Sequence, residues 1–241
     1  MKALILGGGR GKRLEELSEE TAKCMLVIRD KPLIEYSLDC AVATDVSEIV
    51  ILVGYRAEEI INRYGNSYQG KRIKYVIQRE QRGVVHALEC VIDAIQGEDF
   101  MLLLGDELMI NPKHPQMMKA YIDESLFGVC GVIPVGDINL IKKTYSIIQG
   151  DNHRIFRLIE KPTRPMNNFM GTGNCIFKNE IFSYIEQTPI NQKRGEKELV
   201  DLIQCAIDEG HAIKSFIICD KYFNINFKDE MQEAVSYFAH F

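Results

Sequence analysis

Short apolar runs alternate with amphipathic segments along the first half of the chain. Apolar residues at helical spacing predict helices in this half at 32–44, 57–64 and 84–95. Runs that are apolar almost throughout predict strands between them, at 3–6, 48–53, 73–77 and 100–104. Strands of this kind, separated by helices, are typical of a parallel sheet that is covered on both faces. The pattern therefore predicts an α/β fold.

The second half of the chain is less regular but gives no sign of a separate unit. It contains no low-complexity linker, no block of like charges and no internal repeat. Further strands are expected at 127–134, 155–160, 172–177 and 211–218, with a helix at 200–209. We therefore expect one domain over residues 1–241, with an elaborated C-terminal half.

The composition fits a globular protein and disfavours one class of partner. Of the 241 residues, 46% are hydrophobic and 26% are charged, as expected for a chain that buries a sizeable core. The 29 Lys and Arg residues are outnumbered by 34 Asp and Glu residues, which gives a net charge of −5. A protein that binds a nucleic-acid backbone normally has a basic excess, so we expect no nucleic-acid partner. The negative net charge is still compatible with a small polyanionic ligand, because binding such a ligand needs only a local cluster of positive groups.

The cysteines and the apolar runs indicate where in the cell the protein is expected. The seven cysteines include no C-x-x-C pair and mostly lie inside apolar runs, which favours buried thiols over disulfides or a zinc site. The first apolar run stops at glycines after four residues, so no signal peptide is expected. No stretch approaches the roughly 18 apolar residues of a membrane span, so no membrane partner is expected. These features predict a soluble, cytoplasmic protein.

A glycine-rich loop after the first predicted strand is the strongest local signal. Glycine occupies positions 7, 8, 9 and 11, and Arg10, Lys12 and Arg13 add cations. Glycines let backbone N–H groups come close to phosphate oxygens, so the loop predicts a phosphate site. The spacing fits neither a Rossmann G-x-G-x-x-G nor a Walker loop, because Lys12 stands where the first needs Gly and Arg13 where the second needs Ser or Thr. The alternative is a tight turn with solvated cations.

At this loop the sequence resembles the sugar-phosphate nucleotidyltransferases, the pyrophosphorylases that make nucleotide sugars. Their opening reads L-A-G-G-x-G-T-R-L, followed a short distance later by P-K-P-M. The matching residues are Gly8, Gly9, Gly11, Arg13, Leu14, Lys23 and Met25. The departures are Gly7, Lys12, Ala22 and Cys24, and the last two replace prolines, which is expected to loosen the loop that carries Lys23. The resemblance implies nucleotide binding by Leu6, Gly8, Gly9, Gly11, Arg13 and Lys23.

Two later motifs resemble the base-reading and metal-binding segments of the family. Residues 78–87, QREQRGVVHA, resemble Q-x-E-Q-x-G-T-x-H-A, in the form found in UDP-N-acetylglucosamine pyrophosphorylases. The resemblance implies that Gln78 and Gly83 bind the base, whereas a lone Gln at a strand end is more often solvent-facing. Gly105-Asp106 resembles the strand-ending G-D, which implies that Gly105 binds the nucleotide and that Asp106 holds Mg²⁺. In isolation, Asp106 also fits a helix cap or a turn.

Motifs of the second half resemble the sugar-phosphate site of the family. Glu160-Lys161-Pro162 resembles E-K-P, which implies that Glu160 binds sugar hydroxyls and Lys161 contacts the sugar phosphate. Gly173, in Gly171-Thr172-Gly173, resembles the glycine that leaves room for the sugar. Ser146 occupies a position of the sugar-phosphate site that is usually Gly. Residues 194–201 resemble the R-G-E-x-E-x-T-D segment that opens a helix.

A pair of asparagines near the C-terminal end resembles a metal-binding segment. Residues 222–231, YFNINFKDEM, resemble W-x-D-I-G-T-P-E-D-L, whose Asp is the second metal ligand. Asn224 takes the place of that Asp, as Asn does in some relatives, and Asn226 is the alternative if the register shifts by two. An amide oxygen coordinates Mg²⁺ but contributes no charge.

The resemblance implies the nucleotide-diphospho-sugar transferase fold, a Rossmann-like mixed, mostly parallel sheet flanked by helices. Residues 1–110 would form the nucleotide-binding half and residues 111–241 the sugar-phosphate-binding half. The implied reaction joins a nucleoside triphosphate, with UTP or dTTP favoured, and a sugar 1-phosphate, giving a nucleotide sugar and pyrophosphate. Mg²⁺ is the expected cofactor. The expected catalytic residues are Arg13, Lys23, Asp106 and Lys161.

Several alternatives stay open at this point. The departures from the family pattern fit a catalytically silent nucleotide- or sugar-binding regulator on the same fold, and the acceptor could be a non-sugar phosphate. A dinucleotide-dependent dehydrogenase shares the strand–glycine–helix opening but lacks the required glycine spacing. The chain ends soon after the asparagine pair, so we expect a catalytic core without appended domains, while a homo-oligomer through a face of that core stays open.

Overall fold

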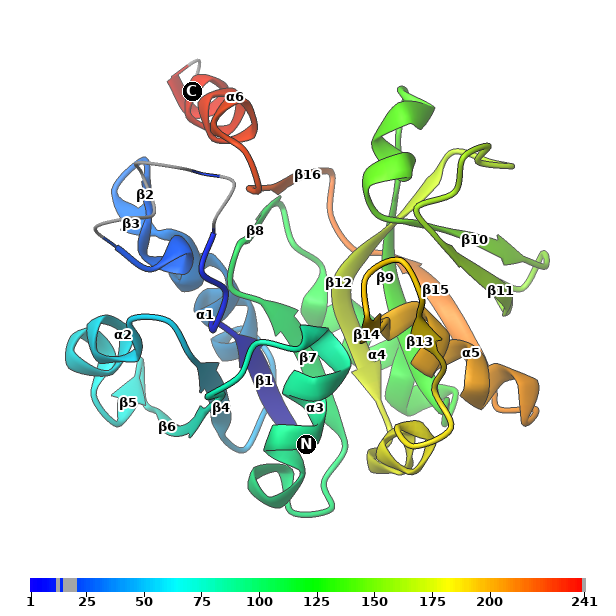
Figure 1. Cartoon of the computed structure of the whole chain (residues 1–241), viewed down its shortest axis with the longest axis horizontal. Coiled ribbons are helices and arrows are strands. Elements are labelled where there is room, and N and C mark those ends of the chain that lie inside the picture. The colour runs from blue at the N-terminus through cyan, green and yellow to red at the C-terminus, as the bar shows by residue number, and fades with distance from the viewer. Residues whose placement is uncertain (12–13, 15–20, 240–241) are drawn as a thin grey trace.

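The computed structural model describes residues 1–11, 14 and 21–239. Within these residues a ten-stranded sheet runs through the molecule in the order β11-β10-β12-β7-β1-β4-β6-β5, with β9 attached to β12 and β15 to β9 (Figure 1). Its centre is parallel, because β1 pairs with β4 and β7, and β4 pairs with β6. These strands are β1 (Lys2–Leu6), β4 (Ile49–Val53), β6 (Lys71–Ile77) and β7 (Phe100–Leu104), and the short edge strand is β5 (Ser67–Tyr68).

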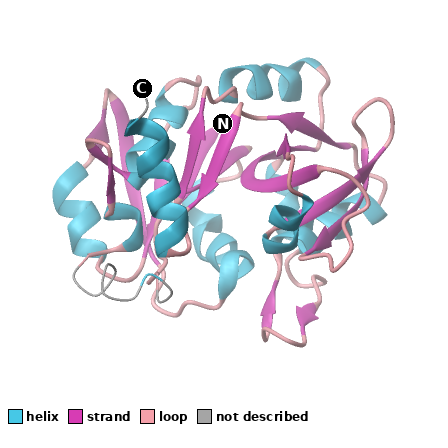
Figure 2. Cartoon of the chain, turned by 90° about the horizontal axis from the view of Figure 1, so that it is seen from above, coloured by secondary structure: helices cyan, strands magenta, loops and turns pink. Residues whose placement is uncertain are grey.

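Helices cover both faces of the sheet because side chains along each strand alternate between the two faces. Ala3 and Ile5 on β1 pack into one apolar cluster, whereas Leu4 between them packs into a second cluster. Figure 2 shows helices on both sides of the strands. The first cluster is covered by α1 (Leu33–Val42), α2 (Ala57–Tyr64) and α4 (His114–Asp123), and the second by α3 (Gly83–Ile95) and α5 (Leu199–Asp208).

The second half of the chain extends the same sheet from β7. The strand β12 (Phe169–Phe177) runs antiparallel to β7 and makes the sheet mixed. Its other neighbours are β9 (Gly128–Pro134) and β10 (Tyr145–Gln149), which continue to β15 (Ile213–Ile217) and β11 (Ile155–Glu160). Smaller elements are η3 (Ile138–Lys143), η4 (Asn179–Tyr184), β13 (Ile190–Asn191) and β14 (Glu196–Lys197). The expected mixed, mostly parallel sheet flanked by helices is confirmed.

The expected elements recur with their ends moved by at most a few residues, but several observed elements were not predicted. The ranges 57–64, 100–104 and 155–160 coincide with α2, β7 and β11. The helix α4 was missed because Pro115 lies in its first turn, and β10 because Ser146 and Gln149 break its apolar run.

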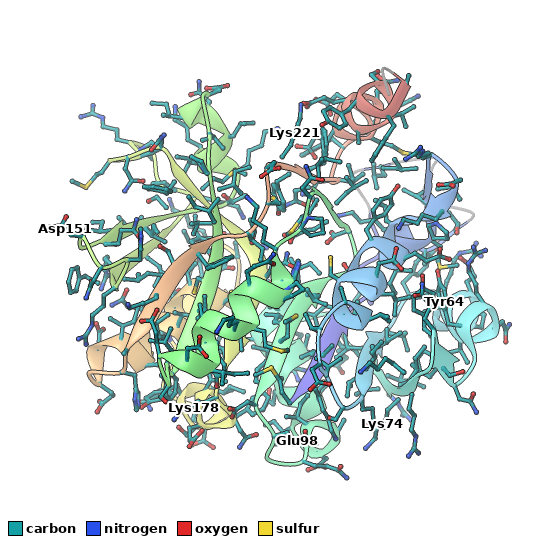
Figure 3. The ribbon with its side chains drawn as sticks, turned by 180° about the vertical axis from the view of Figure 1, so that it is seen from behind. Tyr64, Lys74, Glu98, Asp151, Lys178 and Lys221 are labelled. Carbon is teal, nitrogen blue, oxygen red and sulfur yellow. The ribbon has the colours of Figure 1, made fainter. Side chains whose placement is uncertain are left out.

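The C-terminal residues return to the first half of the chain. The strand β16 (Lys221–Asn224) pairs antiparallel with β8 (Glu107–Ile110), which follows β7 directly. Lys221 begins this strand below α6 (Lys228–Ala239), as Figures 1 and 3 show. Ala234 of α6 packs with Ile28 of β2 (Val27–Ile28), beside β3 (Lys31–Pro32). The C-terminal segment therefore packs against residues 27–32 of the first half of the chain and reaches the turn that follows β7.

Two findings concern the sequence-based expectations about thiols and membranes. The seven cysteines are free thiols and five of them are buried, so the expectation of buried thiols holds for most. Among the described residues, no helix combines the length and the apolar character that a membrane crossing requires.

Candidate functional site

Two adjoining cavities lie at the carboxyl ends of the parallel strands. The first, here called the nucleotide cavity, is lined by Leu6, Gly7, Gly8, Gly9, Lys23, Cys24, Leu52, Gln78, Gln81, Gly83, Val84, Ala87, Leu104 and Asp106. The second, here called the acceptor cavity, contains Glu160, Lys161 and Arg194. The two cavities share Gly83, Val84, Leu104 and Asp106. Open α/β sheets bind ligands at this edge.

The glycine loop forms the floor of the nucleotide cavity. Gly7 N–H donates to Leu52 O at 2.8 Å, which fixes the loop against β4. A Cβ on Gly54 would lie 2.9 Å from Gly8 O, so the loops after β1 and β4 touch backbone to backbone. A Cβ on Gly9 would have no described neighbour within 4 Å. Lys12 and Arg13 lie outside the described residues, and the expected role of Arg13 stays a prediction.

Lys23 is held by an anchored loop, contrary to the expectation that two missing prolines loosen it. It lies in η2 (Lys23–Met25), and its side chain is buried. Ala22 N–H donates to Glu59 Oε2 of α2 at 2.9 Å, and Thr21 Oγ1 donates to the same oxygen at 2.8 Å. A proline at position 22 would have no N–H to donate. The substitution therefore replaces a conformational constraint with a hydrogen bond to α2.

Gln78 is buried at the end of β6, which rules out a solvent-facing role. Only 6% of its surface is exposed, and it lines the nucleotide cavity. Its Nε2 lies 2.9 Å from His86 Nδ1 of α3. Nearby, Gln81 Nε2 donates to Gly8 O and so joins the start of α3 to the glycine loop.

Gly83 begins α3 in a conformation that only glycine adopts without strain. Its φ is +88°, and a Cβ would lie 2.4 Å from Glu196 Oε2. Glu196 is an acceptor-cavity residue that pairs with Arg194. The base-reading motif and the R-G-E motif therefore touch at this glycine.

Asp106 connects three segments that are far apart in the sequence. It follows β7 and forms an ion pair with Lys23. Lys23 Nζ also donates to Asn226 Oδ1 at 2.9 Å, and Asn226 Nδ2 donates to Asn224 Oδ1 at 2.7 Å. Ile225 N–H donates to Asp106 O at 3.2 Å, which fixes the asparagine segment on the Asp106 turn. Asp106 therefore lies in a turn between strands and caps no helix.

Glu107, the next residue after Asp106, is buried and collects hydrogen bonds from three other segments; it is here called the Glu107 hub. Its carboxyl group accepts hydrogen bonds from Gly173 N–H at 3.0 Å, from Asn174 Nδ2 and from the Tyr222 hydroxyl. Burial raises the pKa of this carboxyl to about 8, although these donors oppose the shift. The Glu107 carboxyl group therefore links the G-D motif to the T-G segment and to the strand that leads into the asparagine pair, through buried hydrogen bonds.

On one side of the acceptor cavity, the carboxylates of Glu160, Glu196 and Glu198 face the cations of Lys161 and Arg194. Glu160 lies 3.2 Å from Lys161 Nζ, and Arg194 approaches both Glu198, at 3.2 Å, and Glu196. Burial raises the pKa of Glu160, and the charges of Lys161 and Arg194 act in the opposite direction. The Glu160 and Lys161 expected from sequence are thus together in one cavity.

Two of the expected acceptor-site residues have a different setting from the one that the resemblance implied. Ser146 is buried and pairs with Met170 within the sheet, and it is not among the described residues that line the cavity. Its neighbour Tyr145 lines the cavity instead, because adjacent strand residues face opposite sides. Gly173 does line the cavity, but a Cβ there would lie 2.2 Å from Leu104 Cδ1. Close packing against β7 is therefore one reason for glycine at this position.

The sequence reasoning missed several residues that line the two cavities. Glu107 follows the expected ligand Asp106 directly but was given no role. Others lay inside quoted motifs but were given no site role, and Lys143 and Thr144 had no motif at all. These missed residues are Gln81, Glu107, Lys143, Thr144, Tyr145, Thr172, Arg194, Glu196, Glu198 and Tyr222.

Comparison with known sequences relates the chain to characterised enzymes. The sequence model of the nucleotidyl transferase family matches residues 2–224. The UTP–glucose-1-phosphate uridylyltransferase AglF of Haloferax volcanii is 33% identical over 235 residues, which are 97% of this chain and 95% of that protein. The glucose-1-phosphate thymidylyltransferase of Streptomyces griseus is 27% identical over 225 residues, 90% of this chain and 60% of that protein. The bifunctional protein GlmU of Methanocaldococcus jannaschii is 30% identical over 216 residues, 87% of this chain and 47% of that protein.

Solved structures agree on the fold. The crystal structure of UDP-glucose pyrophosphorylase complexed with UDP-glucose matches with a TM-score of 0.89 and 22% identity, over 99% of this chain and 98% of that one. A putative glucose-1-phosphate thymidylyltransferase from Bacillus anthracis matches with a TM-score of 0.87 and 21% identity, over 98% and 94% of the two chains. The resemblance drawn from the motifs is confirmed: the chain belongs to the nucleotidyl transferase family.

Proposed function

We propose that the chain joins a nucleoside triphosphate to a sugar 1-phosphate and releases pyrophosphate. One observation carries this proposal: the nucleotide cavity and the acceptor cavity meet at Asp106. Relatives named for uridylyl and thymidylyl transfer to glucose 1-phosphate support UTP or dTTP as the nucleotide. The cations Lys23 and Lys161, one in each cavity, support a phosphorylated substrate on both sides.

The oxygen atoms around Asp106 suit Mg²⁺. The Lys23 ammonium donates to both Asp106 and Asn226, so these oxygens already hold a positive charge between them. Among the described residues, no group of three or more His, Cys, Asp or Glu side chains could hold a metal ion alone. Mg²⁺ commonly takes one or two carboxylates and completes its shell with phosphate oxygens and water. In the proposed site Asp106 would hold the ion together with Asn226 or Asn224, and Mg²⁺ would supply neutralisation of phosphate charge there.

The proposed reaction depends on charge neutralisation rather than on activation of a nucleophile. The sugar phosphate attacks through an oxygen that is already anionic, so no side chain must remove a proton. A bond forms from that oxygen to the α-phosphorus as the bond from the α-phosphorus to pyrophosphate breaks. Lys23 and Lys161 reduce the repulsion between the two polyanions, and the glycine-loop N–H groups hold the departing phosphates, with Arg13 assigned to them by sequence.

A catalytically silent binding protein is the competing candidate. It would bind nucleotide in the same cavity but would lack turnover. The buried Lys23, its contact with Asp106 and the exposed Lys161 favour catalysis, because these are the charges that the reaction needs. The acceptor itself is proposed as a sugar 1-phosphate, with another phosphate monoester as the alternative.

The test is pyrophosphate release from UTP, dTTP, CTP, GTP and ATP, each combined with several sugar 1-phosphates and Mg²⁺. We expect turnover with UTP or dTTP and at least one sugar 1-phosphate. Asp106→Ala should abolish turnover, while the surface control Asp123→Ala, which removes only the ion pair with Lys119, should not. Nucleotide binding without turnover for every pair would favour the silent protein instead.

A further inference from the structure

The polar environment of Gln78 continues away from the cavity into α3. His86 Nδ1 lies 2.9 Å from Gln78 Nε2, and His86 Nε2 lies 3.8 Å from Cys90 Sγ, one helical turn further along. Neither His86 nor Cys90 is among the residues that line the nucleotide cavity. The row Gln78–His86–Cys90 therefore has one member at the cavity and two members behind it.

The hydrogen bond between Gln78 and His86 holds the amide with its nitrogen toward His86 when the imidazole proton is on Nε2. An amide nitrogen only donates, so His86 Nδ1 must accept, and the imidazole proton is carried by Nε2. That proton is directed to Cys90 Sγ, a weak acceptor. Burial raises the pKa of Cys90, which keeps it a thiol.

The other end of the amide faces the glycine loop. A Cβ on Gly8 would lie 3.5 Å from Gln78 Oε1. No hydrogen bond from a described residue reaches this oxygen, in contrast to Nε2. The cavity therefore presents beside Gly8 an acceptor to which no described residue donates. The first N–H groups of α3, at Gly83 and Val84, have no partner within the helix and line the same cavity.

We propose that His86 is a positioning residue that makes the nucleotide cavity selective for pyrimidines with an N3–H. The inference rests on the proposed function and deepens it. Uracil and thymine carry N3–H between two carbonyl oxygens, and this edge fits an acceptor flanked by N–H donors. Cytosine has a lone pair at N3, which would face the lone pairs of Gln78 Oε1. His86 enforces the difference by preventing the amide from turning its nitrogen toward the base.

The experiment compares kcat/KM for UTP and CTP in the wild-type enzyme and in His86 variants. A site built around a hydrogen bond rejects a mismatched edge strongly, so we expect at least about a 100-fold preference of the wild type for UTP. His86→Leu frees the amide to rotate, and the preference should fall about 10-fold or more. His86→Asn keeps an acceptor near the Nδ1 position and should retain most of the preference. In a Gln78→Ala variant, the further change His86→Leu should leave the ratio of kcat/KM for UTP to that for CTP unchanged. If His86 had a purely structural role, His86→Leu would change this ratio in the Gln78→Ala variant as well.

The outcomes separate this inference from the proposed function. If the wild type turns over neither UTP nor dTTP, the pyrimidine form of the proposed function fails and the inference fails with it. If the wild type prefers UTP but His86→Leu keeps the ratio within twofold, only the role of His86 is overturned. Circular dichroism and thermal unfolding of each variant confirm that a changed ratio comes from a folded protein.

Discussion

Lys23 Nζ lies 2.9 Å from Asn226 Oδ1, although 203 positions separate the two residues in the sequence. The contact arises because β16 pairs with β8 directly after the Asp106 turn, while the first residue of η2, Lys23, forms an ion pair with Asp106. An ammonium group thus joins the first motif of the chain to the last one. Because Asp106 and Asn226 share this ammonium, a cation that binds both of these oxygens competes with Lys23.

Replacing Lys23 tests that competition. Lys23→Met should lower turnover at least about 100-fold, because a charge that faces the reacting phosphates is lost. The same change frees the oxygens of Asp106 and Asn226, so the nucleotide-free variant should bind Mn²⁺ more tightly than the wild type. Titration of free Mn²⁺ by electron paramagnetic resonance measures this affinity. Lys31→Met, which removes the partly exposed ion pair with Asp39, is the matched control and should change neither quantity.

The two asparagines should differ in their effect on the metal requirement. Asn226 Oδ1 faces the same ammonium as Asp106, whereas Asn224 Oδ1 accepts from Asn226 Nδ2. Asn226→Ala should therefore raise the Mg²⁺ concentration for half-maximal activity by about 10-fold or more, with a smaller rise for Asn224→Ala. The reverse order would identify Asn224 as the direct ligand and Asn226 as its support.

The sequence predicted the structure and the site correctly where a residue's role depends on the residues next to it in the chain. Uninterrupted apolar runs such as 100–104 predicted the central parallel strands, and the motifs placed Asp106 and Lys161 at strand ends. Periodicity alone could not show that β16 returns to β8, because strand pairing depends on the whole fold and not on the local pattern. For the same reason the resemblance left Asn224 and Asn226 undecided.

The hub at Glu107 shows a second limit of sequence-based prediction. A Glu next to the expected ligand Asp106 looks like a surface residue, yet its carboxyl group receives bonds from Gly173, Asn174 and Tyr222. Those partners lie on β12 and at the start of β16, so no spacing in the sequence relates them to Glu107. Ser146 illustrates the opposite error, since a family position was carried over but the strand turns its side chain away from the cavity.

Gly83 should tolerate no side chain, for two separable reasons. Its φ of +88° costs an L-residue about 1 kcal/mol of unfolding free energy, and a Cβ would also meet Glu196 Oε2 at 2.4 Å. Gly97 has a similar φ of +76°, but no described residue lies within 4 Å of a Cβ there, so Gly97→Ala is the matched control. In urea unfolding, Gly83→Ala should lose about 1 kcal/mol or more beyond the loss of Gly97→Ala. Equal losses would show that Glu196 moves aside without cost.

His114 should make the protein less stable at mildly acidic pH. It is 1% exposed, its Nε2 lies 2.8 Å from Asn174 Oδ1, and burial lowers its pKa to about 4. As the pH falls below about 6.5, the unfolded chain binds a proton at this residue while the folded protein does not. The stabilising effect of the neutral imidazole is therefore complete above pH 6.5 and is lost as the pH falls toward 4.

The measurement for His114 is the free energy of unfolding between pH 7 and pH 5. The wild type should lose about 2 kcal/mol more than His114→Gln across this interval, because only the wild type carries the titrating group. Every other ionisable group is present in both proteins and cancels in the comparison. His211→Gln is the matched control, since His211 is half-buried and hydrogen-bonded to the Tyr184 hydroxyl at 2.7 Å. A His114→Gln profile parallel to that of the wild type would mean that the imidazole takes up a proton in the folded state and finds an acceptor at Nδ1, the atom that has no hydrogen-bond partner among the described residues.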